Sequence, residues 1–346
     1  MGSADGALDD AELGEEPDEL DELLRRPTHA DTGAYFAELF CWPTGIVVNE
    51  GDALGRKWRG LLLSAEAARN TIFGYFPATD GAGYALERFD FLTSNKEQQF
   101  AGTDFKGGTV TSEIRTYFRP SDVAVGADGA IYVADWFDPR VGGHDDKDES
   151  TSGAIYRIAP KGFVPRIPKL DLATIEGEIA ALRSPAVNVR ASGFAKLSAR
   201  GSAAIPAVAK LLEDENSFIR ARATWLLAKL GPDGIERVKA QLASRDPMQR
   251  IVAYRALRSV NRAMPEIALQ LARDPSAAVR REVALSLRDV PFEQARELLL
   301  IIARGYDGKD RAYLEAWGIG ATGKEEPLYA ALSSTQTEAD ATKWPR

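Results

Sequence analysis

Apolar and polar residues alternate along this chain with two different periods. Between residues 34 and 162, apolar residues come in short runs rich in β-branched and aromatic side chains, with Gly, Asn and Asp between the runs. That pattern is typical of antiparallel β-strands joined by turns. From residue 173 onward, apolar residues recur every three to four positions, which indicates amphipathic helices. A Pro-containing stretch, residues 163–172, lies between them, so the sequence predicts a β domain, a linker and a helical domain.

The clearest strand pattern lies between residues 118 and 162. Two short apolar runs, residues 122–125 and 130–134, flank a Gly-Ala-Asp-Gly turn in which Asp128 is the expected turn former. A third run, residues 154–158, follows a polar segment. Three such strands form an antiparallel meander, which corresponds to one blade of a β-propeller.

A second group of strands precedes this meander. Four apolar runs with turn residues between them would complete one four-stranded blade. The runs are residues 45–48, 60–64, 71–76 and 84–91, and the turns are residues 49–52 and 78–81. Two blades do not close a propeller, which needs about four or more. We therefore expect a partial propeller whose open edges a partner or another chain covers, or two sheets that pack on the helical domain as a compact cap.

The helical domain follows a repeat of thirty residues. Arg190, Arg220, Arg250 and Arg280 occupy the same position in four similar segments, at intervals of 30 residues. A preceding helix is expected at residues 205–212, 235–242 and 267–272, and a looser fifth copy at residues 292–304 and 310–319. Because helix pairs of this size bury their apolar stripes only by stacking on their neighbours, residues 173–320 are predicted to form an α-solenoid. The period is shorter than the roughly 40–47 residues of HEAT repeats, so these repeats are HEAT-like. Residues 321–346 are expected to form a cap and tail.

The regular spacing of the arginines has two interpretations. Four guanidinium groups on equivalent helices could line a groove for an acidic ligand or for nucleic-acid phosphates. Alternatively, Asp214, Asp246 and Asp274, at the turns before the arginine helices, could form an Asp–Arg ladder that holds consecutive repeats together. Between residues 169 and 320 there are 24 basic and 18 acidic residues. This excess is small for a nucleic-acid-binding protein, so the ladder is favoured and no nucleic-acid partner is expected.

Charge and cysteine content add three expectations. Residues 1–33 contain eleven acidic residues and two arginines, a net charge of −9, whereas the whole chain carries −8. We predict that this segment is a disordered acidic lead, and it has no apolar stretch resembling a secretory signal. Cys41 is the single cysteine, which excludes an intrachain disulfide and a CxxCH haem attachment in this chain. No run of 18 apolar residues is present, so no membrane-spanning helix is expected.

One polar loop is a candidate metal site. Asp138, His144, Asp145 and Asp146 lie in the loop between the second and third strands of the meander. An oxygen-rich loop of this kind suits Ca²⁺, which takes six to eight oxygen ligands. The loop lacks the D-x-D-x-D-G spacing of a calcium-binding loop, so a solvated acidic loop is the alternative.

The meander also carries a family resemblance. The sequences RPSDVAVGADGAIYVADWFDPRVGGH and GAIYRIAPKG, residues 119–144 and 153–162, resemble the closing blade of sorbosone- and glucose-dehydrogenase-like propellers. Such propellers occur in the membrane-bound dehydrogenase-like proteins of planctomycetes and verrucomicrobia, where HEAT-like repeats and often a c-type haem domain follow. The resemblance extends from about residue 35 to the end of the helical repeats. It implies that this chain is the C-terminal part of a longer propeller protein of the periplasm or cell envelope, in which further blades or a haem domain would be partners.

The resemblance has consequences for chemistry. Related propellers bind pyrroloquinoline quinone (PQQ) over the central channel, and arginines hold its carboxylates. Arg119 and Arg140 are the residues implied as cofactor contacts here; the alternative is that they pair with Asp122 and Asp138. The catalytic histidine of the family lies in an earlier blade, so no catalytic residue is assigned in this chain. If active, the chain would be a quinone-dependent sugar or alcohol dehydrogenase.

Two functions are therefore expected from the sequence. In the first, the chain is the C-terminal portion of a dehydrogenase-like propeller protein and is catalytically incomplete alone. In the second, it is a non-enzymatic scaffold whose solenoid binds a protein or glycan on its concave face.

Overall fold

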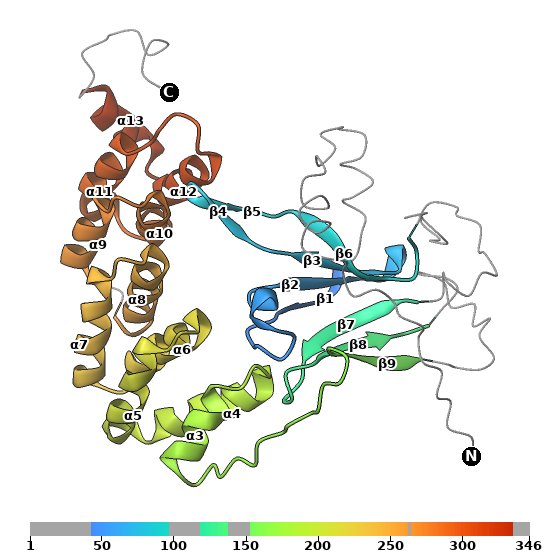
Figure 1. Cartoon of the computed structure of the whole chain (residues 1–346). Coiled ribbons are helices and arrows are strands. Elements are labelled where there is room, and N and C mark those ends of the chain that lie inside the picture. Colours follow the sequence, from blue (N-terminus) through green and yellow to red (C-terminus); the bar gives the residue numbers. More distant parts are fainter. Residues whose placement is uncertain (1–42, 97–117, 138–152, 262–263, 335–346) are drawn as a thin grey trace, which may run out of the picture. The chain divides into compact units, whose positions relative to one another are not determined.

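The computed structural model describes residues 43–96, 118–137, 153–261 and 264–334 (Figure 1). Small antiparallel sheets come first in the sequence and helices follow. Two compact units are formed. The first contains the described residues of Met1–Pro77 and Leu86–Arg166, and the second those of Ala78–Ala85 and Ile167–Arg346. The division at Arg166 lies within the stretch that the sequence indicates as a linker, but the assignment of Ala78–Ala85 to the helical unit was not expected.

The first unit contains a four-stranded antiparallel sheet. Its strands are β1 (Pro43–Val48), β2 (Leu62–Glu66), β3 (Thr71–Tyr75) and β6 (Arg88–Thr93), in that order across the sheet. The first three strands overlap their predicted positions. The predicted fourth strand, residues 84–91, is wrong, because residues 86 and 87 interrupt it and only the part from Arg88 onward pairs with β3.

A three-stranded antiparallel sheet completes the first unit. Its strands are β7 (Pro120–Val125), β8 (Ile131–Asp135) and β9 (Ala154–Ile158), in that order. The predicted meander is confirmed. Alternate residues of β8 are buried, as expected for a strand with one face against a core.

The two sheets of the first unit meet at β1 and β7. The Thr44 hydroxyl donates a hydrogen bond to the carbonyl oxygen of Pro120 at 2.9 Å. A Cβ atom added to Gly45 would lie 2.8 Å from Cα of Asp122, so the two backbones approach too closely for any larger residue. Apolar side chains of both sheets form one core, among them Leu63, Ile72, Val123, Ile131 and Val133.

The second unit consists of a β-hairpin and a series of helix pairs. The hairpin strands are β4 (Ala78–Asp80) and β5 (Gly83–Ala85). The helices that come first in each pair are α3 (Ile175–Leu182), α5 (Ile205–Ala209), α7 (Pro232–Ala240), α9 (Pro265–Ala272) and α11 (Phe292–Arg304). The helices that come second are α4 (Val187–Ala199), α6 (Ser217–Leu227), α8 (Pro247–Val260), α10 (Ala277–Ser286) and α12 (Arg311–Ala321), and α13 (Glu325–Ser333) follows. Each predicted arginine-bearing helix is present.

Local signals in the sequence define where these helices begin. Asn216 caps α6 by accepting a hydrogen bond from the Phe218 N–H, and Asp246 caps α8 by accepting one from the Met248 N–H. Pro247 occupies the first position of α8. A backbone N–H at that position would have no acceptor within the helix, so the absence of an N–H in proline removes no hydrogen bond. The turns before α6 and α8 therefore begin these two arginine-bearing helices at a defined residue.

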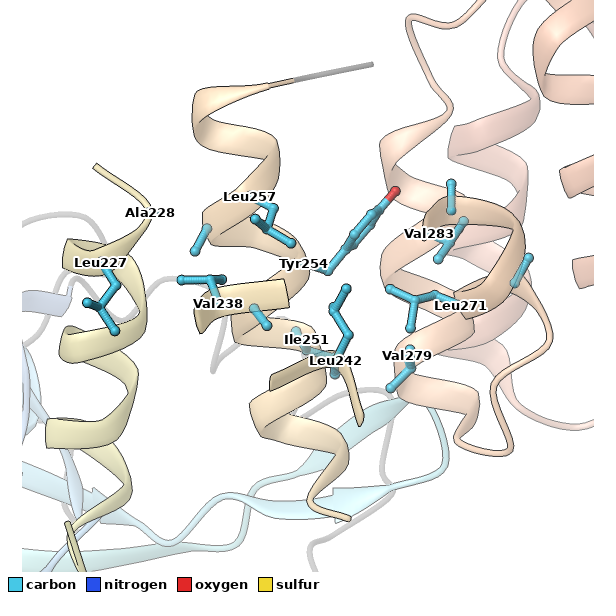
Figure 2. Close-up of a cluster of buried hydrophobic side chains, with 14 of the residues drawn as sticks. Leu227, Ala228, Val238, Leu242, Ile251, Tyr254, Leu257, Leu271, Val279 and Val283 are labelled. Carbon is cyan, nitrogen blue, oxygen red and sulfur yellow. The ribbon is translucent and has the colours of Figure 1, made fainter. Parts of the chain in front are cut away.

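One continuous apolar core runs through the helix pairs (Figure 2). Leu227, Val238, Leu257 and Leu271 come from four successive helices and are almost completely buried. Burial of a leucine side chain of this kind stabilises a fold by about 1.5–3 kcal/mol. Since each pair shares its core with the next, no pair has a core of its own. Within the described residues, no helix is both long and apolar enough to cross a membrane.

Candidate functional site

Arg119, implied by the family resemblance as a cofactor contact, lies in the core of the first unit. Its side chain is completely buried, and its Nη1 donates a hydrogen bond to the Ala67 carbonyl oxygen at 3.0 Å. Its backbone N–H donates to Oδ1 of Asp135 at 2.7 Å. Asp122, in contrast, is exposed, and its carboxylate accepts a hydrogen bond from the Val123 N–H. This burial favours a structural role for Arg119.

Asp135 connects the end of β8 to its neighbours. Besides Arg119, its Oδ1 accepts a hydrogen bond from the Phe137 N–H at 2.8 Å, and its Oδ2 accepts one from the Tyr156 hydroxyl at 3.2 Å. Burial, together with the negative charge of Asp135, raises the pKa of Tyr156. Phe137 has a φ of 54°, a left-handed conformation that is costly for an aromatic residue. Asp135 thus ties all three strands together at one end of the sheet.

The other residues predicted from the sequence divide into two groups. Asp128 forms the expected turn, since its Oδ1 accepts a hydrogen bond from the Ala130 N–H at 3.1 Å. The remaining predicted cofactor and metal residues lie outside the described residues, and the roles proposed for them stay predictions. These residues are Asp138, Arg140, His144, Asp145 and Asp146.

The four regularly spaced arginines share one backward contact. In each, Nη1 donates a hydrogen bond to a backbone carbonyl oxygen in the turn that precedes its own helix. The acceptors and distances are Pro185 for Arg190 (2.6 Å), Asp214 for Arg220 (2.8 Å), Ser244 for Arg250 (2.8 Å) and Asp274 for Arg280 (2.7 Å). These carbonyl groups lie beyond the end of the preceding helix, where backbone acceptors need a partner.

Two of these arginines also reach a carboxylate of the next pair. Arg250 pairs with Asp274 through two short hydrogen bonds, and Arg220 lies 3.8 Å from a carboxylate oxygen of Asp246. Two rungs of the predicted ladder are therefore present, and their direction was predicted wrongly: the carboxylates belong to the following turn, and the preceding turn contributes carbonyl groups. Arg280 instead reaches forward to the Tyr313 hydroxyl and the Gly305 carbonyl oxygen. Asp214 departs from the pattern and pairs with Arg183 at 2.5 Å.

The structure reveals a site that the sequence did not: the tip of the β4–β5 hairpin inserts against the helices (Figure 1). Ala82 at the tip is 1% exposed and belongs to the apolar core of the helical unit. Its N–H donates a hydrogen bond to Oδ2 of Asp310 at 2.6 Å. The glycines on both sides allow this approach, because a Cβ on Gly81 would collide with the Asp310 carboxylate and one on Gly83 would lie 2.9 Å from Cβ of Ala312. We call this contact surface of Asp310 and Ala312 the hairpin dock.

Asp310 serves two elements at once. While Oδ2 binds the hairpin, Oδ1 accepts a hydrogen bond from the Tyr313 N–H at 2.9 Å and so caps α12. Asp307 holds the loop before it by accepting hydrogen bonds from the Asp310 and Lys309 N–H groups, which lower the pKa of Asp307. Asp310 is thus also held by contacts within the helical unit that do not involve the hairpin.

An open pocket of about 480 Å³ lies beside the dock. The hairpin contributes Asp80 and Tyr84 to its wall, and the start of α12 contributes Arg311 and Glu315, which form an ion pair at 2.6 Å. Tyr84 is half exposed, and its hydroxyl lies 3.5 Å from the Met248 sulfur on α8. The pocket thus combines an aromatic ring with charges of both signs, which suits a polar ligand or the polar rim of a protein interface.

A local signal for this site exists in the sequence. Asp80-Gly81 is a strong turn pair, and Gly83 follows two residues later. The turn was expected at residues 78–81, yet the strand β4 occupies Ala78–Asp80. No pattern near the hairpin indicates Asp310 as its partner, because the two are 228 residues apart.

Comparison with known proteins adds little to this geometry. No protein family matches the chain, and no curated protein matches it. Among solved structures, the chain is similar to the crystal structure of an engineered protein from a structural genomics consortium, with a TM-score of 0.28 and 18% sequence identity. The similarity covers 48% of this chain and 91% of that chain, and at this TM-score it carries no argument. The structure alone thus defines a protein of small antiparallel sheets and repeat-like helix pairs.

Proposed function

We propose that this chain is a protein-binding scaffold, in which the helix pairs form an α-solenoid and the surface presented by the second helices of the pairs binds an extended or hairpin segment. The observation that carries this proposal is the hairpin dock. In this chain the face made by α8 and α12 already holds a β-hairpin, through a backbone N–H bound to Asp310 and through close contacts with small residues.

The solenoid part of the proposal rests on how consecutive pairs are joined. The thirty-residue spacing of the arginines, the forward contacts of Arg220 and Arg250 with the next turn and the continuous core support a similar relation between consecutive pairs. That is the nearest-neighbour organisation of repeat proteins, which present extended binding surfaces.

The kind of partner follows from the chemistry of the contacts. Main-chain groups and small side chains supply the contacts of the hairpin tip, as in other modes of recognition of extended peptides. The guanidinium groups of Arg250 and Arg280 bind carbonyl groups and neighbouring side chains within the helical unit. These contacts favour a polypeptide partner over a phosphate ligand.

Peptide binding to a variant whose dock is empty would test the scaffold proposal. We would replace residues 78–85 by a flexible Gly-Ser linker in the full chain and titrate it with a labelled cyclic peptide that contains residues 76–87. Saturable binding, weakened at least about tenfold by Asp310→Asn, is the expected result. The asparagine side chain can still cap α12 through its oxygen, but it then turns an NH₂ donor toward the Ala82 N–H. A folded variant that does not bind the peptide would contradict the proposal.

A second candidate function is favoured by the contact between the two sheets. We propose that they are neighbouring blades of a dehydrogenase-like propeller, because β1 and β7, the first strand of each sheet, lie side by side at Gly45 and Asp122. Ile155 on β9 is 75% exposed, although β3, the corresponding third strand of the other sheet, is almost fully buried. A fourth strand beside β9 would cover Ile155, as β6 covers β3.

Titration with PQQ and Ca²⁺ would test the dehydrogenase function. The expected result is a rise in the melting temperature that Arg140→Ala abolishes, together with turnover in a dye-coupled assay on sugars. Arg311→Ala, which removes an 89% exposed arginine side chain of the helical unit, is the control. Absence of both thermal shift and turnover would leave the scaffold proposal as the better account.

A further inference from the structure

We infer that the hairpin dock also receives the hairpin of a second copy of this chain, so that two copies bind each other by exchanging Ala78–Ala85. This inference rests on the proposed function of the dock and names one partner for it. The partner supplies residues to the site, since the dock is complete only when an Ala82 N–H occupies Asp310.

The first argument is that the hairpin interface is self-contained. The hydrogen bond to Asp310, the insertion of Ala82 into the helical core and the close contact of Gly83 with Ala312 all come from the tip of one eight-residue segment. The hairpin of another copy brings the same eight residues. It can therefore make each of these contacts without any change in the dock.

The second argument concerns what holds the hairpin in place. Its two strands are three residues each and continue, in the same register, the pairing of β3 with β6. The strand pairing on one side and the dock on the other therefore both maintain the hairpin, and the dock is what holds its tip. Pro77 and Leu86, at the two ends of the segment, are exposed, so the chain can change direction there without removing buried side chains.

The third argument is thermodynamic. An exchanged hairpin recreates the interface of the single chain, so the contact energies on both sides of the equilibrium are equal. The equilibrium between a hairpin bound in its own dock and a hairpin bound in the dock of another chain then depends on two concentrations. One is the effective concentration of the hairpin tethered to its own dock, and the other is the concentration of protein chains in solution. Exchange is expected to grow with protein concentration and to be favoured by any change that disables the dock of the hairpin's own chain.

A mixture of two complementary full-length variants tests the inference. Ala82→Glu places a charge on the inserted residue and leaves the dock intact. Ala312→Leu fills the space opposite Gly83 and leaves both the hairpin and the Asp310 cap intact. We expect each variant alone to be a monomer of 37.6 kDa and the mixture to form a one-to-one complex of twice that mass in analytical ultracentrifugation. A mixture that stays monomeric at several hundred micromolar would overturn the inference.

Two further measurements keep the outcome interpretable. Circular dichroism and thermal melting establish that each variant is folded; if Ala312→Leu is not, Asp310→Asn replaces it as the dock variant. Adding Gly83→Val to the Ala312→Leu chain should reduce complex formation at least about tenfold. The donated hairpin then carries a valine that collides with Ala312 in the intact dock of the other chain. If the vacant dock binds the cyclic peptide but the mixture stays monomeric, exchange fails while the scaffold proposal stands.

Discussion

Arg250 and Asp274 form a two-point ion pair between consecutive helix pairs, with Nε to Oδ2 at 2.8 Å and Nη2 to Oδ1 at 2.6 Å. Both side chains are about nine-tenths buried. The same guanidinium group holds the Ser244 carbonyl through Nη1, so one side chain joins the start of its own helix to the turn of the next pair. A planar fork of donors can do this, whereas a lysine ammonium cannot.

Removal of one member of this pair should destabilise the helical unit strongly. For Arg250→Ala we expect a loss of about 3–5 kcal/mol in the free energy of unfolding, because Asp274 is left as a buried charge. Arg250→Lys should lose part of that. Urea denaturation measures both. The control is Arg311→Ala, which breaks an exposed pair with Glu315 and should cost less than about 0.5 kcal/mol. Equal losses in the two alanine variants would contradict the role given to Arg250.

Two glycines of α12 should respond in opposite directions to the same substitution. Gly318 has open space around it, so Gly318→Ala should stabilise the helix by about 0.5–1 kcal/mol. A Cβ on Gly320 would collide with the Ala284 carbonyl oxygen of α10, so Gly320→Ala should destabilise by about 1–3 kcal/mol. Thermal unfolding of the two variants measures the difference. Stabilisation by both would show that α10 and α12 are not in close contact at Gly320.

The turn residue Asp128 should make the first unit sensitive to acid. Burial raises the pKa of its carboxyl group, but hydrogen bonds from the Ala130 N–H, Arg157 and Tyr132 outweigh burial and lower the pKa below its ordinary value of 3.8. A carboxyl group with a lowered pKa contributes stability above its ordinary pKa, and this contribution is lost as pH falls through the folded-state pKa.

Asp128→Asn is therefore expected to lower the free energy of unfolding near pH 7 and to flatten its decrease below about pH 4. Chemical denaturation across a pH series checks both effects. Asp122→Asn, at an exposed position of β7, is the control, and it should change stability at pH 7 by no more than about 0.5 kcal/mol. Parallel pH profiles of wild type and Asp128→Asn would refute the assigned hydrogen bonds.

The hairpin tip should be released by one added methyl group. Gly81 has a φ of +53° and faces the Asp310 carboxylate, so Gly81→Ala adds both backbone strain and a collision. Gly323→Ala is the matched control, since Gly323 has a φ of +73° but open space around it. Hydrogen exchange of the Ala82 N–H should accelerate at least about tenfold in the first variant and stay unchanged in the second. Unchanged protection in Gly81→Ala would argue against the dock.

Much of the secondary structure follows from local pattern. The meander of β7, β8 and β9 was predicted within one or two residues, because alternating apolar residues and a Gly-Ala-Asp-Gly turn act over short distances. Helix α11, Phe292–Arg304, was predicted with its observed bounds for the same reason. The fourth strand of the first sheet was not, because residues 84–91 read as one apolar run although the chain turns away in the middle.

The arginine ladder shows a different limit of prediction from the sequence. The thirty-residue interval between Arg220, Arg250 and Arg280 is visible in the sequence, and so is the presence of Asp residues near each turn. Spacing alone does not say which Asp each arginine meets, since the carboxylates before and after a helix are at similar distances along the chain. Helix packing decided that Arg250 reaches forward to Asp274.

By itself, the sequence determined the order of strands and helices, the thirty-residue repeat, and the polar residues that cap the helices and form the turns. These depend on backbone propensity and on periodicities of two and 3.6 residues, which act within a few positions. Only the tertiary structure decided that Arg119 is buried beside Asp135 and that the hairpin carrying Ala82 belongs with the helices. The physical reason is that both contacts join residues far apart in the chain, and their energy comes from burial and complementary hydrogen bonds that exist only once the elements have packed.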